Sequence, residues 1–253
     1  MRNWKQHRMQ RRRTAYSKSS IIVLLFPALL LSILNLSKSF SSDAVVESDL
    51  CQPGRPCLYR DKVDLRIIVM TYNRSSSLIE LLKTIDTLLL DRQSAALEIW
   101  IDRNKTTGEV DAQTLQKASE FKWSQGPSRV HIQKAHVGIY GQWIDTWRPH
   151  DDSDDEVALF LEDDCSISKY AYRWIRAVFR TYSHRRDFAG ASLTTYQRKT
   201  YSDSRNTALV GPKNHTVMMY KGFETWGFAP KPKQWRKFQV SPEFCCRYMH
   251  CIT

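Results

Sequence analysis

The sequence predicts an α/β domain with a doubly wound, mostly parallel sheet, placed behind a single N-terminal transmembrane helix. From about residue 63 onward, short apolar segments alternate with amphipathic ones, an order typical of strand–helix–strand units. A separate uncharged apolar run occupies residues 20–36. The chain has 253 residues, 42% hydrophobic and 25% charged, which is enough for one sizeable core and excludes wholesale disorder.

The N-terminus carries much of the net charge of +12. Residues 1–19 hold seven lysines and arginines and no acid, and the uncharged run SIIVLLFPALLLSILNL follows at 20–36. Seventeen residues are at the short end of what a bilayer requires. A cleaved signal peptide is the alternative, but the basic segment is long and no clear small-x-small cleavage site follows, which favours an anchor. Positive charge before the span predicts a cytosolic tail and a lumenal domain, the type II orientation.

No nucleic-acid partner is expected for the basic tail. The sequence contains no zinc-finger Cys/His spacing, no basic-region heptads and no RNP-type aromatic motif. A tail that bound nucleic acid or anionic lipid would do so with a strong salt dependence. We interpret the basic tail as the segment that sets the orientation of the chain in the membrane. The segment 20–36 is interpreted as the part that contacts the bilayer.

Cysteines and glycosylation triplets are compatible with an oxidising, lumenal compartment. Cys51 and Cys57 are spaced to close a small loop, and a disulfide there is the favoured interpretation. A zinc site is the alternative, but the C-terminal cysteines lack a second partner pair. Asn-x-Ser/Thr triplets stand at Asn73, Asn104 and Asn214.

The first half of the domain follows a stem at 37–62, which is rich in Ser, Asp and Pro. The β-branched run 65–70 predicts a strand, and LIELLKTIDTLLL at 78–90 has the periodicity of a helix after a Ser-rich start. A second strand is predicted at 97–101, followed by a polar helix at 111–121.

The second half repeats the pattern. Strands are predicted at 129–133 and 157–161, with a helix between them at 138–147. The acidic run 151–156 precedes the second of these strands and is expected to be a solvated loop, with a calcium site as the less favoured alternative. The segment 170–182 predicts a helix whose residues Tyr170, Trp174 and Val178 face the core.

Polar motifs follow three of the predicted strands: TYNR at 71–74, IDRN at 101–104 and LEDD at 161–164. Ligands of doubly wound sheets bind at the carboxyl ends of the strands, so these motifs are the candidate site. No GxGxxG follows the first strand and no GxxxxGK[ST] occurs in the chain. A dinucleotide dehydrogenase and a P-loop phosphotransferase are therefore disfavoured.

Three adjacent acids, Glu162, Asp163 and Asp164, emerge directly from a buried strand. They repel one another unless a cation joins them, and Mg²⁺ or Mn²⁺ would keep coordination positions open for the phosphates of a nucleotide. Such an ion would neutralise a departing diphosphate as a Lewis acid. The alternative is an acidic turn that caps the following helix, and the local sequence alone does not choose between the two.

The order of these motifs resembles a GT-A glycosyltransferase of the nucleotide-diphospho-sugar transferase superfamily. The resemblance covers residues 64–238 and includes HIQKAHVGIYGQWIDTW at 131–147 and FLEDDCSISKYAYRWI at 160–175. Within that superfamily the layout is similar to family 2-like enzymes and to Golgi N-acetylglucosaminyltransferases. The resemblance implies a nucleotide-sugar donor, a glycan or glycoprotein acceptor and a Golgi or endoplasmic-reticulum membrane location.

On the donor side, the resemblance implies that Thr71, Asn73 and Arg74 border the nucleotide and that Asp102 meets its base or ribose. Simpler interpretations remain open for some of them. Asn73 and Arg74 would otherwise only start the following helix, and Asp102 would be a turn residue.

At the acidic motif, the resemblance implies that Asp164 binds Mn²⁺ (or Mg²⁺) directly, while Glu162 and Asp163 orient the ribose and the waters of the metal. Farther along, the segment 188–194 resembles the strand after the metal motif and 222–229 the segment that lines the donor sugar and acceptor. There, Trp226 would stack on a sugar or pack in the core, and Gly227 would let the backbone approach the sugar.

The resemblance also implies a carboxylate that acts as catalytic base. An inverting transferase needs a carboxylate that deprotonates the acceptor hydroxyl, and related Golgi enzymes carry it beyond the helix that here begins near Pro232. Glu243 is the carboxylate in that position, and Glu224 is the other candidate. Because the chain stops soon afterwards, a C-terminally truncated catalytic domain at 63–253, or an inactive paralogue, is also an expectation.

Together these expectations describe a metal-dependent hexosyl- or N-acetylhexosaminyltransferase of the secretory pathway, using a donor such as a uridine diphosphate sugar. The alternative is a non-catalytic membrane protein that keeps the same fold as a binding or partner module.

Overall fold

The computed structural model describes residues 46–47, 56–193, 219 and 225–240. All of them belong to one compact unit, Phe40–Thr253. The predicted tail at 1–19, the predicted span at 20–36 and the C-terminal cysteines lie outside the described residues. Within the described ranges, no helix has the length and apolar character needed to cross a bilayer.

A seven-stranded sheet forms the centre of the unit, in the order β1-β4-β3-β2-β5-β7-β6. The strands β1 to β5 pair in parallel, whereas β7 runs antiparallel to both β5 and β6. Their bounds are β1 Val46–Glu47, β2 Leu65–Thr71, β3 Ala95–Ile101, β4 Ser128–Ile132, β5 Val157–Glu162, β6 Gly190–Ser192 and β7 Phe228–Pro230. The prediction of a mostly parallel α/β sheet is confirmed.

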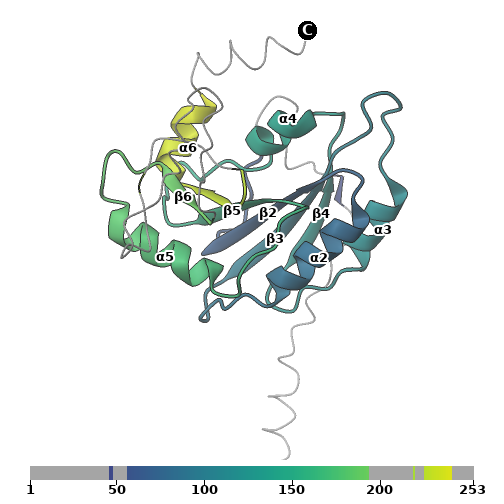
Figure 1. The fold of residues 1–253 in the computed structure, drawn as a ribbon. Coiled ribbons are helices and arrows are strands. Elements are labelled where there is room, and N and C mark those ends of the chain that lie inside the picture. The colour runs from purple at the N-terminus through teal and green to yellow at the C-terminus, as the bar shows by residue number, and fades with distance from the viewer. Residues whose placement is uncertain (1–45, 48–55, 194–218, 220–224, 241–253) are drawn as a thin grey trace, which may run out of the picture. The chain divides into compact units, whose positions relative to one another are not determined.

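Helices cover both faces of this sheet (Figure 1). The first face packs against α2, α3 and α5, and the second packs against α4 and α6. Their bounds are α2 Ser75–Asp86, α3 Ala112–Glu120, α4 Gly138–Asp145, α5 Ala171–Tyr182 and α6 Pro232–Gln239. Because helices lie on both faces, the fold is doubly wound as the sequence predicts.

The strand order reverses between β2 and β5. The chain proceeds from β2 outward to β3 and β4, and then returns to place β5 on the other side of β2. Thr71 pairs with Ile101 of β3, and Met70 pairs with Glu162 of β5. The carboxyl ends of β2 and β5 therefore flank the topological switch point, where doubly wound folds bind their ligands.

The helix α2 shows why the local pattern folds as it does. Leu78, Leu81, Leu82 and Ile85 are fully buried, and they form one apolar stripe against β2 and β3. The predicted helix at 78–90 is confirmed as far as Asp86 and wrong beyond it.

A tight turn follows α2, five residues beyond the end of the helix. Asp91 and Arg92 adopt positive φ values of 52° and 66°, and Gln93 N donates to Leu90 O at 2.9 Å. Arg173 of α5 fixes this turn through a two-nitrogen ion pair with the Asp91 carboxylate. Leu88 and Leu90 remain buried, so their apolar character reflects burial and not helical structure.

A buried network of charged side chains crosses the second face of the sheet. Glu98 of β3 accepts hydrogen bonds from Arg66 at 2.7 Å and Arg129 at 2.8 Å, and His131 Nε2 lies 2.7 Å from its other oxygen. Arg66 also donates to Glu156 at 2.9 Å. The prediction of a solvated loop at 151–156 is therefore wrong for Glu156, which is buried because it pairs with Arg66.

Two further predictions are modified by the structure. Tyr170 is 50% exposed at the start of α5 and does not face the core, whereas Val178 is buried. Cys57 is disulfide-bonded, but Cys51 lies outside the described residues, so the predicted Cys51–Cys57 pairing stays a prediction. Cys165 carries a free thiol.

Candidate functional site

The three strand-end motifs meet at the carboxyl edge of the sheet, and Thr71 lies at their centre. The amide of Asp102 donates to Thr71 O at 3.0 Å, and the amide of Asp163 donates to Met70 O at 3.1 Å. The ladder thus continues one residue past each strand and places Asp102 and Asp163 on either side of Thr71. Candidate residues from three separate segments of the sequence become neighbours.

Arg74 joins two carboxylates of the acidic motif. Its Nη1 donates to Asp164 Oδ2 at 2.9 Å, and its Nη2 forms an ion pair with Asp163 Oδ1. The second oxygen of Asp163 accepts a hydrogen bond of 2.6 Å from Thr71 Oγ1. The mutual repulsion of the acids is therefore relieved inside the protein by a guanidinium and a hydroxyl.

Burial controls the acidity of this motif. Asp163 is 1% exposed, and burial raises its carboxyl pKa, although the Thr71 hydrogen bond and the Arg74 charge oppose the rise. Burial also raises the pKa of Glu162, opposed by a hydrogen bond from Trp143, while the neighbouring Asp164 charge adds to the rise. Both pKa values are raised because the surrounding hydrogen bonds and the Arg74 charge do not fully offset the cost of burying the two negative charges. Additional positive charge at this edge would be stabilising.

The donor atoms at this edge suit a divalent ion that completes its coordination with a ligand. Within the described part of the chain, no group of three or more His, Cys, Asp or Glu side chains is placed to hold a metal by itself. Asp164 is half exposed and Glu162 is partly exposed, and carboxylate oxygens are the donors that Mg²⁺ and Mn²⁺ prefer. Asp164 and Glu162 are thus the residues that would hold such an ion, together with phosphate oxygens.

Asp102 connects β3 to the start of α4. Its two carboxylate oxygens accept hydrogen bonds from Val137 N at 3.0 Å and Gly138 N at 2.9 Å, and His136 Nδ1 lies 3.1 Å from it. It is 5% exposed, so the negative charge is held at the positive end of the helix dipole. Its predicted contact with a base or ribose stays a prediction.

Removing the Asp102 carboxylate should destabilise the protein more than removing a partly exposed helix cap. We expect Asp102→Ala to lower the free energy of unfolding by about 2–3 kcal/mol, because buried hydrogen bonds to a charged group are lost. Asp111→Ala is the matched control, since Asp111 caps α3 by accepting from Thr114 N at 2.8 Å at a partly exposed position. There the expected loss is about 1 kcal/mol. Urea denaturation of both variants measures the difference, and equal losses would contradict the positioning role of Asp102.

A glutamine pair, which the sequence did not reveal, links three strand ends. Gln142 Nε2 lies 3.3 Å from Thr71 O and 3.4 Å from Trp100 O. Its Oε1 accepts from Gln133 Nε2 at 3.0 Å, at the end of β4. Both glutamines are buried. The position of Gln142 beside the apolar Trp143 and Ile144 is the signal that would have indicated this role, because buried amides require partners.

The other predicted site residues have different surroundings. Asn73 is exposed beside Arg74. Trp226 is 62% exposed, so its core-packing alternative is wrong. Gly227 has a φ of +77°, and a Cβ there would approach Leu193 to within 3.0 Å, which explains the glycine by backbone conformation and local packing. The base candidates Glu224 and Glu243 lie outside the described residues.

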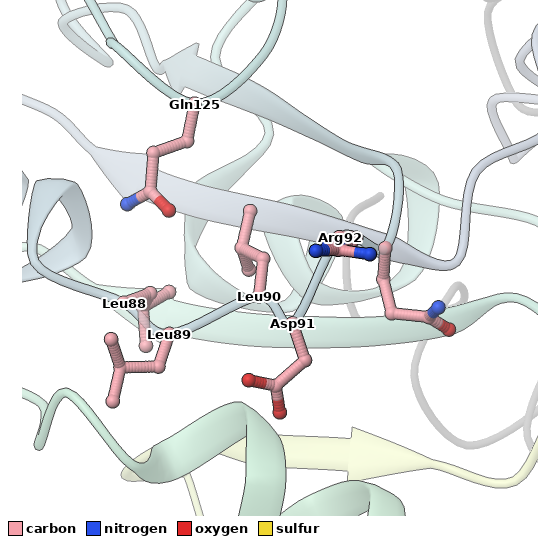
Figure 2. Close-up of a pocket in the computed structure, with 7 residues that line it drawn as sticks. Leu88, Leu89, Leu90, Asp91, Arg92 and Gln125 are labelled. Atoms are coloured by element: carbon pink, nitrogen blue, oxygen red, sulfur yellow. The ribbon is translucent and has the colours of Figure 1, made fainter. Parts of the chain in front are cut away.

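A surface hollow of about 340 Å³ lies at the amino ends of the strands, away from the candidate site (Figure 2). It is lined by the turn that precedes β3 and by Gln125, which precedes β4. Gln125 Nε2 donates to Asp86 O at 2.7 Å. Because the hollow lies at the amino ends of the strands, it is separate from the candidate site.

Comparisons with known proteins give a weak likeness. No protein-family model and no curated protein matches the sequence. Two crystal structures of S. aureus TarS, one of residues 1–349, are similar at a TM-score of 0.36 and 18% identity, over 47% of this chain. The matched region covers 33% of the shorter TarS chain and 20% of the longer one. At these values the likeness assigns neither a family nor an activity.

Proposed function

We propose that this chain is a glycosyltransferase that moves a sugar from a nucleotide diphosphate donor to a glycan or glycoprotein acceptor. The observation that supports this most directly is the meeting of Arg74 with Asp163 and Asp164 at the switch point of a doubly wound sheet. Crevices of this kind bind nucleotides. A guanidinium beside carboxylates can bind a diphosphate together with its divalent ion.

Each residue of the edge has a separate task in this proposal. Arg74 binds phosphate oxygens through its planar fork, and the buried Asp163 holds Arg74 in place while Thr71 holds Asp163. Asp164 and Glu162 hold Mn²⁺ or Mg²⁺ with the phosphates. When bound, the ion supplies Lewis-acid neutralisation of the diphosphate that departs.

The acceptor side is proposed from the resembling segment 222–229 and from Glu243 beyond it. Trp226 presents an exposed indole on which a sugar ring can stack. Glu224 and Glu243 are the proposed bases that remove the proton from the acceptor hydroxyl. The membrane anchor at 20–36 would place the reaction in the lumen of the Golgi or endoplasmic reticulum.

A second candidate is a non-catalytic binding module. It is favoured by the internal pairing of Arg74 with both aspartates, which supplies part of the compensating positive charge without a bound ion. Nucleotide binding would be common to both functions, so only turnover distinguishes them.

The test is release of uridine diphosphate from a panel of uridine diphosphate sugars by the full-length chain, with Mn²⁺ or with a chelator. We expect multiple turnovers with Mn²⁺ and a return to the uncatalysed rate with the chelator. Nucleotide binding without turnover over the whole panel would support the binding module. Turnover unaffected by the chelator would contradict the proposed cofactor.

A further inference from the structure

We propose that Arg74 is an exchangeable counter-ion that couples the binding of a nucleoside diphosphate to the binding of a divalent cation. In the protein alone its guanidinium neutralises Asp163 and Asp164, and a diphosphate that engages Arg74 makes Asp164 available to the cation. This inference rests on the proposed function and describes the regulation of the same site.

The contacts of Arg74 place it between the two acids. One terminal nitrogen donates to Asp164 Oδ2 at 2.9 Å, and the other pairs with Asp163 Oδ1. A guanidinium is a planar fork with five N–H donors, so it can bridge two separate carboxylates, which an ammonium does less well. Arg74 thus supplies the positive charge that a divalent cation would supply to the same oxygens.

The two ion pairs differ in how easily they exchange. Asp163 is 1% exposed and its second oxygen is held by Thr71 at 2.6 Å. Asp164 is 47% exposed and Arg74 is 49% exposed. An ion pair between half-exposed side chains is weak in water. The Arg74–Asp164 contact is therefore the one that a ligand can replace, while Asp163 keeps Arg74 at the edge.

The position of Arg74 in the chain favours phosphate as its alternative partner. Arg74 is the residue immediately before α2, and its side chain makes no capping hydrogen bond to that helix. A phosphate that engages the guanidinium would lie beside the positive end of α2, a twelve-residue helix. Because Arg74 would then interact with phosphate, Asp164 would lose its internal partner and gain affinity for a cation.

Coupling of this kind is reciprocal and can be measured with metal alone. The experiment titrates the full-length chain with Mn²⁺ and follows free Mn²⁺ by electron paramagnetic resonance, with and without uridine diphosphate. Arg74→Ala removes the counter-ion and Arg74→Lys keeps the charge but removes the fork. Arg173→Ala is the matched control, because it removes an exposed arginine that pairs with Asp91.

In the absence of nucleotide, we expect Arg74→Ala to bind Mn²⁺ roughly three- to tenfold more tightly than the unmodified chain. Arg74→Lys should lie between the two, and Arg173→Ala should match the unmodified chain. Uridine diphosphate should raise Mn²⁺ affinity less in Arg74→Ala than in the unmodified chain.

Two results would overturn the inference, and they separate it from the proposed function. Mn²⁺ affinity of Arg74→Ala equal to or below that of the unmodified chain, while the unmodified chain shows metal-dependent turnover, would reject the counter-ion role alone. Absence of Mn²⁺ binding by every variant, even with uridine diphosphate present, would reject both the inference and the proposed cofactor. Circular dichroism of each variant verifies that it is folded.

Discussion

Asp164→Asn is expected to lower the rate of uridine diphosphate release by about 10²–10³-fold, the range seen when one preorganised electrostatic contact to developing charge is removed. The substitution keeps the size of the side chain and removes its negative charge. Asp164 is half exposed and its protein partner is Arg74 at 2.9 Å. Arg74 remains paired with the buried Asp163, so the loss would concern the cation proposed at Asp164 and not the position of the arginine.

Stability should be nearly unchanged in the same variant, because half-exposed ion pairs contribute at most about 1 kcal/mol. Asp151→Asn is the matched control: Asp151 is also an exposed aspartate paired with an arginine, Arg148, at 2.9 Å. It lies before β5, at the opposite edge of the sheet, so turnover should not change. Initial rates at saturating donor with Mn²⁺ measure both variants. Equal rates for Asp164→Asn and the unmodified chain would contradict the assigned metal ligand.

Glu98→Gln should have the largest effect on stability, a loss of about 3–5 kcal/mol in the free energy of unfolding. Glu98 is completely buried and interacts with Arg66, Arg129 and His131 within 2.8 Å. Glutamine keeps the shape but removes the only charge that these three side chains share. Arg66 would retain Glu156 and Asp61 as partners, and Arg129 would retain Asp61, so the expected loss comes from the buried contacts that Glu98 itself makes.

Chemical denaturation measures this loss, with Glu80→Gln as the control. Glu80 lies on the exposed face of α2 and pairs with Lys83 at 2.7 Å, both side chains being more than half exposed. Its substitution should change stability by less than about 0.5 kcal/mol. A loss below about 1 kcal/mol for Glu98→Gln would show that the buried network does not act as a unit.

Signals for this buried network are present in the sequence. Glu98 stands inside the apolar strand LEIWI, and Arg66 stands inside the apolar strand LRIIVM. Charged residues in strands that are buried on both faces must be paired, so their coincidence indicates an internal ion pair. The sequence around Glu156 predicts exposure instead of burial, because Glu156 is the last residue of the acidic run 151–156.

The helix α2 illustrates the limit of periodicity. Its apolar spacing continues through Leu88 and Leu89, yet the helix ends at Asp86. Apolar periodicity reports burial, and burial continues after the backbone has left the helix. Asp91 is a residue type that tolerates the left-handed region, whereas the positive φ of Arg92 has no sequence signal.

The sequence by itself determined the alternation of strands and helices from β2 to α5, the doubly wound class and the edge at which the polar motifs gather. These follow from local periodicity and from the geometry of parallel sheets. Only the tertiary structure decided which donor meets which carboxylate. Thr71 and Asp163 are 92 residues apart, and Arg74 and Asp164 are 90 apart. Such contacts exist because β5 returns to lie beside β2, and strand order is a property of the whole packed sheet.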